Sequence, residues 1–253
     1  MKAFKQITGV AAAVLMAAGM MTSCSGGGNT PAKDGPLGSI PSIYKVAGDK
    51  GYEKATELFS ATSREEAGKI MDEVKAIKDQ MEKDVTEAFE AMKGKEIPTV
   101  VSEEVPMKLT TPLTLTEMKS AEYGKFKMEA DVEMTADVSF YKKDTTFPYQ
   151  MIRAVLVDAD GKGLYLIGMP SLNLDKEAES KTGVYPAGTK GHLTLSVRIE
   201  EWNAEPFANM DKICFLEFEK GIYEQAKEIS DSLKEIDRER TKELYKNVKI
   251  EIK

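Results

Sequence analysis

The chain contains few of the residues on which most metal sites and nucleophilic enzymes depend. Its 253 residues include one histidine and two cysteines. No glycine-rich phosphate loop, Gly-x-Ser-x-Gly elbow or Cys-x-x-Cys pair occurs. A histidine-based zinc site or a histidine-activated nucleophile would depend on His192 alone. Because His192 follows Gly191 at the start of an expected strand, we expect it at a surface or edge position. We therefore expect no catalytic residue, no cofactor and no metal.

Basic residues are outnumbered by acidic ones. The chain has 35 Lys and Arg residues against 42 Asp and Glu residues, a formal net charge of -7 at pH 7. Nucleic-acid binding needs clustered basic side chains that displace the counterions of the phosphates. The binding of a polybasic segment to anionic lipid needs a similar excess of basic side chains. We therefore expect no nucleic-acid partner, and membrane attachment has to come from another feature.

The first residues have the order of a bacterial secretory signal. Lys2 and Lys5 precede residues 7–21, all but one of which are apolar or small. A positive segment followed by such a run is typical of an export signal. As a helix the run would be about 22 Å long, shorter than the ~30 Å hydrocarbon core of a bilayer. A transmembrane helix is therefore disfavoured.

The run closes on Met21-Thr22-Ser23-Cys24, which resembles the lipobox of bacterial lipoproteins. The resemblance implies that residues 1–23 are a cleaved signal peptide. It also implies that Cys24 becomes the lipid-carrying N-terminus and holds the protein at the membrane through its acyl chains. An ordinary secretory signal with an incidental cysteine is the alternative.

Residues 24–42 are expected to form a flexible tether. Residues 25–42 contain five glycines, three prolines and no aromatic residue, a composition that buries too little apolar surface to fold. The stretch directly after Cys24 also lacks the acidic run found in many surface lipoproteins of the Bacteroidetes. By that resemblance we expect an envelope lipoprotein that faces the periplasm. Ser25 directly after Cys24 resembles the outer-membrane sorting signal of proteobacterial lipoproteins, so we expect it at the outer membrane.

The second cysteine has no intramolecular partner if Cys24 is acylated, so we expect no disulfide. Cys214 lies in the apolar run 212–218, which is typical of a buried strand. A buried core thiol is the favoured interpretation of Cys214. A reactive thiol and an intermolecular disulfide are the alternatives.

Helical periodicity appears at both ends of the remaining chain, where proline is missing. In residues 43–97 we expect a short helix near 49–59 and then a long amphipathic helix. The long helix begins at Ser63, which forms a capping-box pattern with Glu66, and ends at Gly94. In residues 221–253 we expect a second long amphipathic helix and a final strand that rejoins the β domain.

Residues 98–220 are expected to form an antiparallel β domain. Apolar residues alternate strictly with polar ones over 126–140 and again over 192–200, so each strand has one buried face. Because 15 residues exceed a usual strand, we expect a bend, bulge or turn within 126–140. Two apolar runs flank residues 158–163, which are expected to form a hairpin turn rather than a calcium loop.

The predicted fold class is therefore α+β. It consists of an antiparallel β-sandwich-like domain flanked by two long amphipathic helices. Both helices have narrow apolar stripes, so we expect them to pair in an antiparallel helical hairpin with one end on the β domain.

Three functions are compatible with this organisation. We favour a non-catalytic module that binds or spaces another envelope protein, because the chain has long helices and no catalytic constellation. The first alternative is a glycan- or small-molecule-binding lipoprotein in which Trp202 is an exposed platform. Trp202 could instead cap the core. The second alternative is a hydrolase built on paired carboxylates, of which Glu200 and Glu201 are one example.

Overall fold

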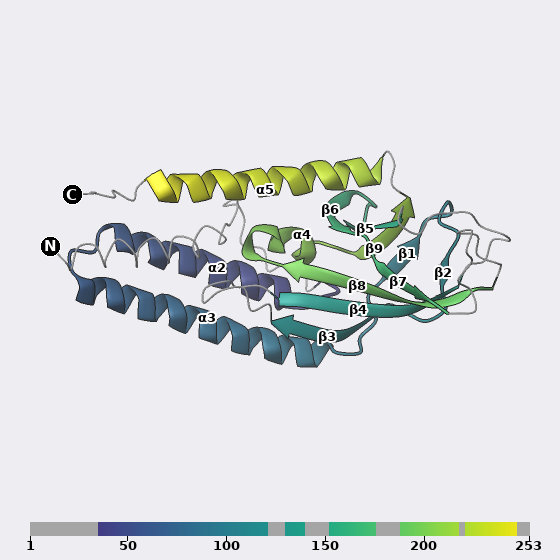
Figure 1. Cartoon of the computed structure of the whole chain (residues 1–253), viewed down its shortest axis with the longest axis horizontal. Coiled ribbons are helices and arrows are strands. Elements are labelled where there is room, and N and C mark those ends of the chain that lie inside the picture. Colours follow the sequence, from purple (N-terminus) through teal and green to yellow (C-terminus); the bar gives the residue numbers. More distant parts are fainter. Residues whose placement is uncertain (1–34, 121–129, 140–151, 176–187, 218–220, 247–253) are drawn as a thin grey trace.

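The structure is a computed structural model that describes residues 35–120, 130–139, 152–175, 188–217 and 221–246. Long helices flank two β-sheets, which confirms the α+β class predicted from the sequence (Figure 1). The expected signal peptide, the lipobox with Cys24 and the expected final strand lie outside the described residues.

Two helices near the N-terminus form a helical hairpin. The first, α2 (Ile40–Thr56), continues into the short 3-10 helix η1 (Glu57–Phe59). The second, α3 (Arg64–Met92), runs back alongside α2 (Figure 1). Pro41 lies in the first turn of α2, where its missing N–H leaves no helical hydrogen bond unmade.

The predicted start of α3 is confirmed. The Ser63 hydroxyl accepts a hydrogen bond from the Glu66 amide at 3.1 Å. The Glu66 carboxylate in turn accepts from the amide and the hydroxyl of Thr62, at 2.8 and 3.0 Å. At the other end, Gly94 follows the helix with a φ of +77°, a conformation that favours glycine.

The first sheet contains four strands in the order β1-β9-β5-β6. Three neighbouring pairs hold it together, and β1 runs parallel to β9 while the other pairs are antiparallel. The predicted hairpin turn at 158–163 connects β5 to β6. The bounds of the strands are β1 (Thr99–Val101), β9 (Lys212–Glu217), β5 (Ile152–Val157) and β6 (Gly163–Gly168).

The second sheet is antiparallel throughout its described strands. Its order is β2-β4-β8-β7, and β3 also pairs with β4. The bounds are β2 (Lys108–Leu109), β3 (Thr114–Ser120), β4 (Ala130–Ser139), β7 (Ser171–Leu174) and β8 (Lys190–Ile199).

The alternating strand β4 pairs with β8 without a shift in register, from Ala130 opposite Ile199 to Ser139 opposite Lys190. Within the described part of 126–140, the pairing with β8 shows no bulge, whereas the neighbouring strand β3 has a register shift between Leu115 and Glu117. Residues 126–129 and 140 lie outside the described residues.

The C-terminal helix α5 (Ile222–Lys246) rests on β6 of the first sheet. A Cβ atom at Gly163 would lie 2.5 Å from the Ile222 carbonyl oxygen, so the helix approaches the strand backbone closely. The hydroxyl of Ser230 accepts a hydrogen bond from the Leu166 amide at 2.9 Å and donates to the Ala226 carbonyl. These contacts seat the first half of α5.

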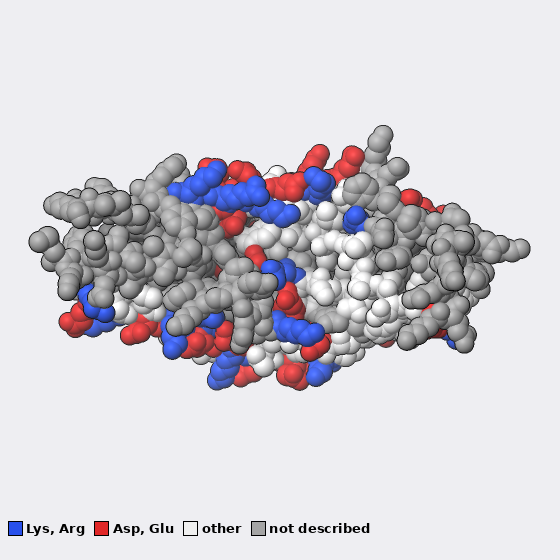
Figure 2. All heavy atoms as spheres, viewed as in Figure 1, with Lys and Arg blue, Asp and Glu red and all other residues white. Residues whose placement is uncertain are grey.

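Charged side chains cover the outer face of α5. Ion pairs join Lys227 to Asp231 and Arg238 to Glu235. Figure 2 shows basic and acidic side chains interspersed along the upper edge of the molecule, where Figure 1 places α5. The outer face of this helix is therefore an electrostatically mixed, solvated surface.

The pairing of the long helices differs from our expectation. We expected α3 and α5 to form the antiparallel hairpin, but the hairpin partner of α3 is α2, and α5 lies on the first sheet instead (Figure 1). The expected tether is also too long at its C-terminal end. Leu37 and Ile40 are fully buried, so residues 35–42 belong to the folded body and supply the beginning of α2.

The core lies between α2, α3 and the two sheets. α2 also packs against η4 (Glu201–Asn203) and α4 (Ala204–Ala208), the short helices that follow β8. The largest fully buried side chains are Tyr44 of α2, Phe207 of α4 and Phe215 of β9. No helix among the described residues is long and apolar enough to cross a membrane.

Candidate functional site

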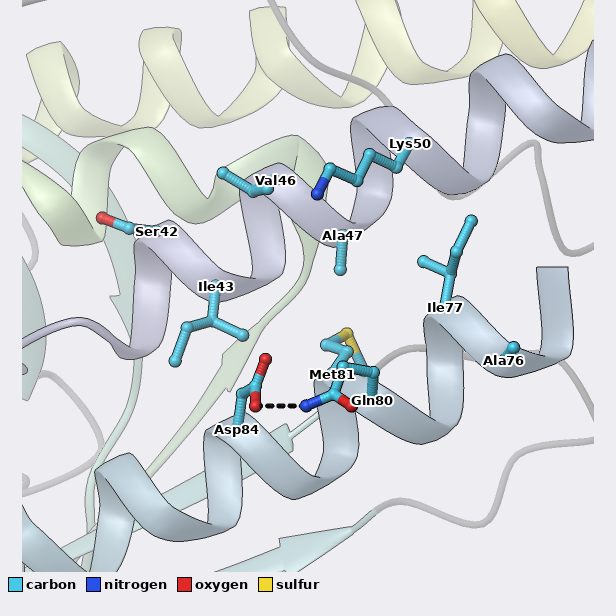
Figure 3. A pocket seen from close by; sticks show the side chains of 10 residues that line it. All are labelled: Ser42, Ile43, Val46, Ala47, Lys50, Ala76, Ile77, Gln80, Met81 and Asp84. Atoms are coloured by element: carbon cyan, nitrogen blue, oxygen red, sulfur yellow. Dashed lines mark hydrogen bonds between the residues drawn. The ribbon is translucent and has the colours of Figure 1, made fainter. Parts of the chain in front are cut away.

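A groove of about 510 Å³ opens between α2 and α3 (Figure 3). Its lining comes in equal parts from the two helices. α2 contributes Ser42, Ile43, Val46, Ala47 and Lys50, and α3 contributes Ala76, Ile77, Gln80, Met81 and Asp84.

The helical period explains why these residues share one surface. On α2 the lining positions 43, 46, 47 and 50 recur at intervals of three and four, and positions 77, 80, 81 and 84 do the same on α3. Such positions lie on one face of a helix. Each wall spans nine residues. Eight steps of about 1.5 Å make the groove about 12 Å long, or about two helical turns.

Small and buried residues form the floor of the groove. Ala47 and Met81 are both buried and point toward one another between the helices (Figure 3). Ala76 adds a second small side chain to the α3 wall. Because alanine leaves space that a longer side chain would fill, the helix pair is not closed over this stretch.

The rim of the groove contains an exposed valine. Val46 is 51% exposed although most of its neighbours in the groove are apolar. A single exposed apolar residue is common on protein surfaces. Here Val46 also lines the groove, so part of the apolar lining is open to solvent.

The two walls carry opposite charges. Lys50 extends from α2, and Figure 3 shows its side chain lying back along the helix toward Val46. On α3 the amide of Gln80 donates a hydrogen bond to the Asp84 carboxylate at 2.6 Å. Among the lining residues, Lys50 is thus the one basic side chain of the α2 wall, and Asp84 is the one acidic side chain of the α3 wall.

A second hollow, of about 370 Å³, lies beside strand β9. Its lining includes Cys214 and two carboxylates, Glu104 and Glu217. Cys214 is a buried free thiol, as we predicted. Burial raises the pKa of the Cys214 thiol, and the negative charge of Glu104 raises it further. Since the thiolate is the reactive form, this cysteine is poorly suited to nucleophilic chemistry.

Trp202 lies in η4, half-buried at the edge of the core. Its indole N–H donates a hydrogen bond to the Glu200 carboxylate, and its ring centroid lies 6.2 Å from that of Tyr165. Trp202 lines neither of the two hollows described above. The ring is thus engaged with the core edge, in the position of a cap.

The carboxylates of Glu200 and Glu201 are both buried in this region. Glu200 caps η4, and its amide donates to the side chain of Asn203 at 2.8 Å. Glu201 packs directly on α2, where a Cβ atom at Gly48 would lie 2.0 Å from its Cγ. Glu200 therefore stabilises the start of η4, and Glu201 packs between η4 and α2.

His192 lies on an exposed face of β8, opposite Asp137 of β4 and Asn173 of β7. Among the described residues, no three His, Cys, Asp or Glu side chains are grouped closely enough to hold a metal ion.

Sequence reasoning did not find the α2–α3 groove. We expected the first helix to begin near residue 49, which places Ser42 in the tether and residues 43–48 in the helical segment ahead of its first helix. The signal was nevertheless present, because Ile43, Val46 and Lys50 have helical spacing.

No protein-family model matches the chain, and no curated protein or solved structure shows significant similarity to it.

Proposed function

We propose that the protein is a lipid-anchored envelope protein that binds an amphipathic helix of another envelope protein in the α2–α3 groove. Lipid on Cys24 would hold it at the outer membrane, facing the periplasm, and it would catalyse no reaction. The observation that carries this proposal is the groove itself, an apolar surface that reaches solvent at Val46 between two charged walls.

The shape of the groove favours a helical occupant. Helix-in-groove recognition places an apolar stripe with intervals of three and four residues against an apolar cleft. Both walls of this groove present side chains at those intervals over about two turns. A third helix lying between α2 and α3 would therefore interlock with both, as helices do in bundles.

The opposite charges of the walls favour a protein helix over a purely apolar molecule. Lys50 and Asp84 lie at the rim, where a polar flank of the occupant could meet them. Charges around an apolar contact contribute more to specificity than to affinity. The anchor adds to this, because a partner in the same membrane is presented at high effective concentration.

A photo-crosslinking amino acid at position 46 tests the proposal in the intact envelope. We expect a covalent adduct to an amphipathic helix of a second protein, mapped by mass spectrometry. The matched control places the same amino acid at position 236, an isoleucine that is 47% exposed on α5. An adduct from position 236 but not from position 46, or adducts to this chain alone, would contradict the proposal.

A charged substitution provides an independent measurement. Val46→Asp places a carboxylate against the apolar floor, so we expect the yield of the complex to fall by about tenfold or more. Ile236→Asp introduces the same charge on an exposed helical site outside the groove, and we expect it to leave the yield unchanged. Because both sites are exposed, both variants should retain their thermal stability.

A small apolar ligand is the second candidate, and one observation favours it. The volume of about 510 Å³ falls within the range of small-molecule sites, which are mostly apolar with few polar groups. The crosslinking experiment distinguishes the two candidates, because a small ligand gives an adduct whose added mass is that of a lipid or metabolite rather than of a peptide.

A further inference from the structure

We infer that the helix bound in the α2–α3 groove has an apolar stripe with an acidic flank on one side and a basic flank on the other. This inference rests on the proposed function and specifies the chemistry of the partner. The acidic flank would face Lys50 of α2, and the basic flank would face Asp84 of α3.

The placement of the two charges follows from the direction of the helices. α2 and α3 run antiparallel, so Ile43 lies across the groove from Asp84, and Lys50 lies across from Ile77 (Figure 3). The basic and the acidic residue therefore lie on opposite walls and begin near opposite ends of the groove. A partner helix meets these charges diagonally.

A helix can match this diagonal because residues beside its apolar stripe project toward both walls. In helical bundles the charged residues on the two sides of the stripe choose the partner and its orientation. A helix with one acidic and one basic flank makes a favourable contact with each wall. A helix with two flanks of the same sign is attracted by the charge of one wall and repelled by the charge of the other.

The same arrangement sets the direction of the bound helix. A bound helix can be reversed by a half-turn that keeps its apolar stripe against the floor of the groove. This half-turn exchanges the two ends of the helix and also moves each flank to the opposite wall. For a given partner, one direction pairs both of its flanks with Lys50 and Asp84, and the reverse direction places like charges together. The wall charges therefore select one direction of the partner along α2.

This symmetry yields a test that uses the native partner and the full chain. The experiment measures the yield of the position-46 crosslink in three variants: Lys50→Glu, Asp84→Lys, and the two combined. Each single reversal makes both walls the same sign, so we expect the yield to fall between about twofold and tenfold. In the combined variant both walls are exchanged, and the helix can bind in the reverse direction. We therefore expect the yield to recover.

Two matched controls separate the wall charges from a general effect of charge. Lys75→Glu and Asp79→Lys make the same changes at exposed positions of α3 that do not line the groove. We expect both to leave the yield unchanged. Thermal unfolding of every variant shows whether the hairpin stays folded.

The outcomes separate failure of this inference from failure of the proposed function. If the protein with unaltered Lys50 and Asp84 forms no crosslink to a second protein, the proposed function is wrong. If that adduct forms but neither reversal lowers its yield, only the charge pattern is wrong. If the single reversals lower the yield and the combined variant lowers it further, the partner helix does not bind in the reverse direction and the charge pattern is wrong. Recovery in the combined variant supports the inference.

Discussion

Replacing Gly48 by alanine tests how closely α2 is seated on the body of the protein. An added Cβ would lie 2.0 Å from Cγ and 2.4 Å from Cβ of Glu201, far inside van der Waals contact. The Glu201 side chain has little room to rotate away, because the residue is buried and only 3% exposed. We therefore expect α2 to move outward from η4, which also changes the wall of the groove.

The magnitude follows from two opposing effects. Alanine in place of glycine within a helix gains about 1 kcal/mol of helix propensity. Overpacking a buried contact costs about 1–3 kcal/mol. Gly48→Ala should therefore destabilise the protein by about 0–2 kcal/mol.

Gly68 of α3 provides the matched control. An added Cβ at Gly68 meets nothing within 4 Å, so Gly68→Ala should show only the helical gain of about 1 kcal/mol. The two variants should differ by about 1–3 kcal/mol. In a chain of this size each kcal/mol shifts the melting temperature by about 2–4 °C.

Thermal and urea unfolding, followed by circular dichroism, measure this difference. The variant Glu201→Ala in the Gly48→Ala background removes the Cγ contact, so we expect part of the lost stability to return as a positive coupling energy. If Gly48→Ala stabilised the protein as much as Gly68→Ala, the close contact between α2 and η4 would be refuted.

Three further predictions concern other parts of the chain. Hydrogen bonds from Thr62 lower the pKa of Glu66, so this carboxylate stabilises the start of α3 above its unfolded-state pKa and loses that effect as the pH falls through the lower folded value. An NMR titration should show the depressed pKa, and Thr62→Val should raise it. Cys214 should react with maleimide more slowly in the folded protein than in denaturant, and Glu104→Gln should speed the reaction by removing a charge that raises the thiol pKa. Cys24→Ala should move the protein from the membrane fraction to the soluble fraction, and an unchanged distribution would count against lipid anchoring.

The elements with local signals were predictable from the sequence. The start of α3 has its own capping residues, and its apolar stripe recurs at helical intervals. Strand β8 has strict alternation, so its buried face could be assigned before its neighbours were known. Cys214 could be placed in a buried strand because its neighbours form a short apolar run. In each case the residues that determine the structure lie within a few positions of one another.

The beginning of α2 was not predictable in this way. Residues 35–42 are rich in glycine and proline, which normally indicates an unstructured segment. Pro41 is nevertheless compatible with a first helical turn, and Leu37 reaches the core only because distant elements surround it. Composition measures local tendency, whereas burial of Leu37 depends on tertiary contacts.

The helix pairing and the groove were hidden for a related reason. An apolar stripe shows that a helix needs a covering, but it does not identify which element covers it. The groove exists because α3 pairs with α2 and because Ala47 leaves space beside Met81. Neither fact could be deduced until the partner of α3 was known. The parallel pairing of β1 with β9 is likewise a long-range contact.

The most direct test of the account is whether the α2–α3 groove is covered in the native envelope. A thiol introduced as Val46→Cys, with Cys214→Ser as the background, can be labelled with maleimide in intact envelopes and in the purified protein. We predict that position 46 is labelled more slowly in the envelope, whereas Ile236→Cys is labelled at the same rate in both. Equal labelling rates at position 46 in the two preparations would contradict the account.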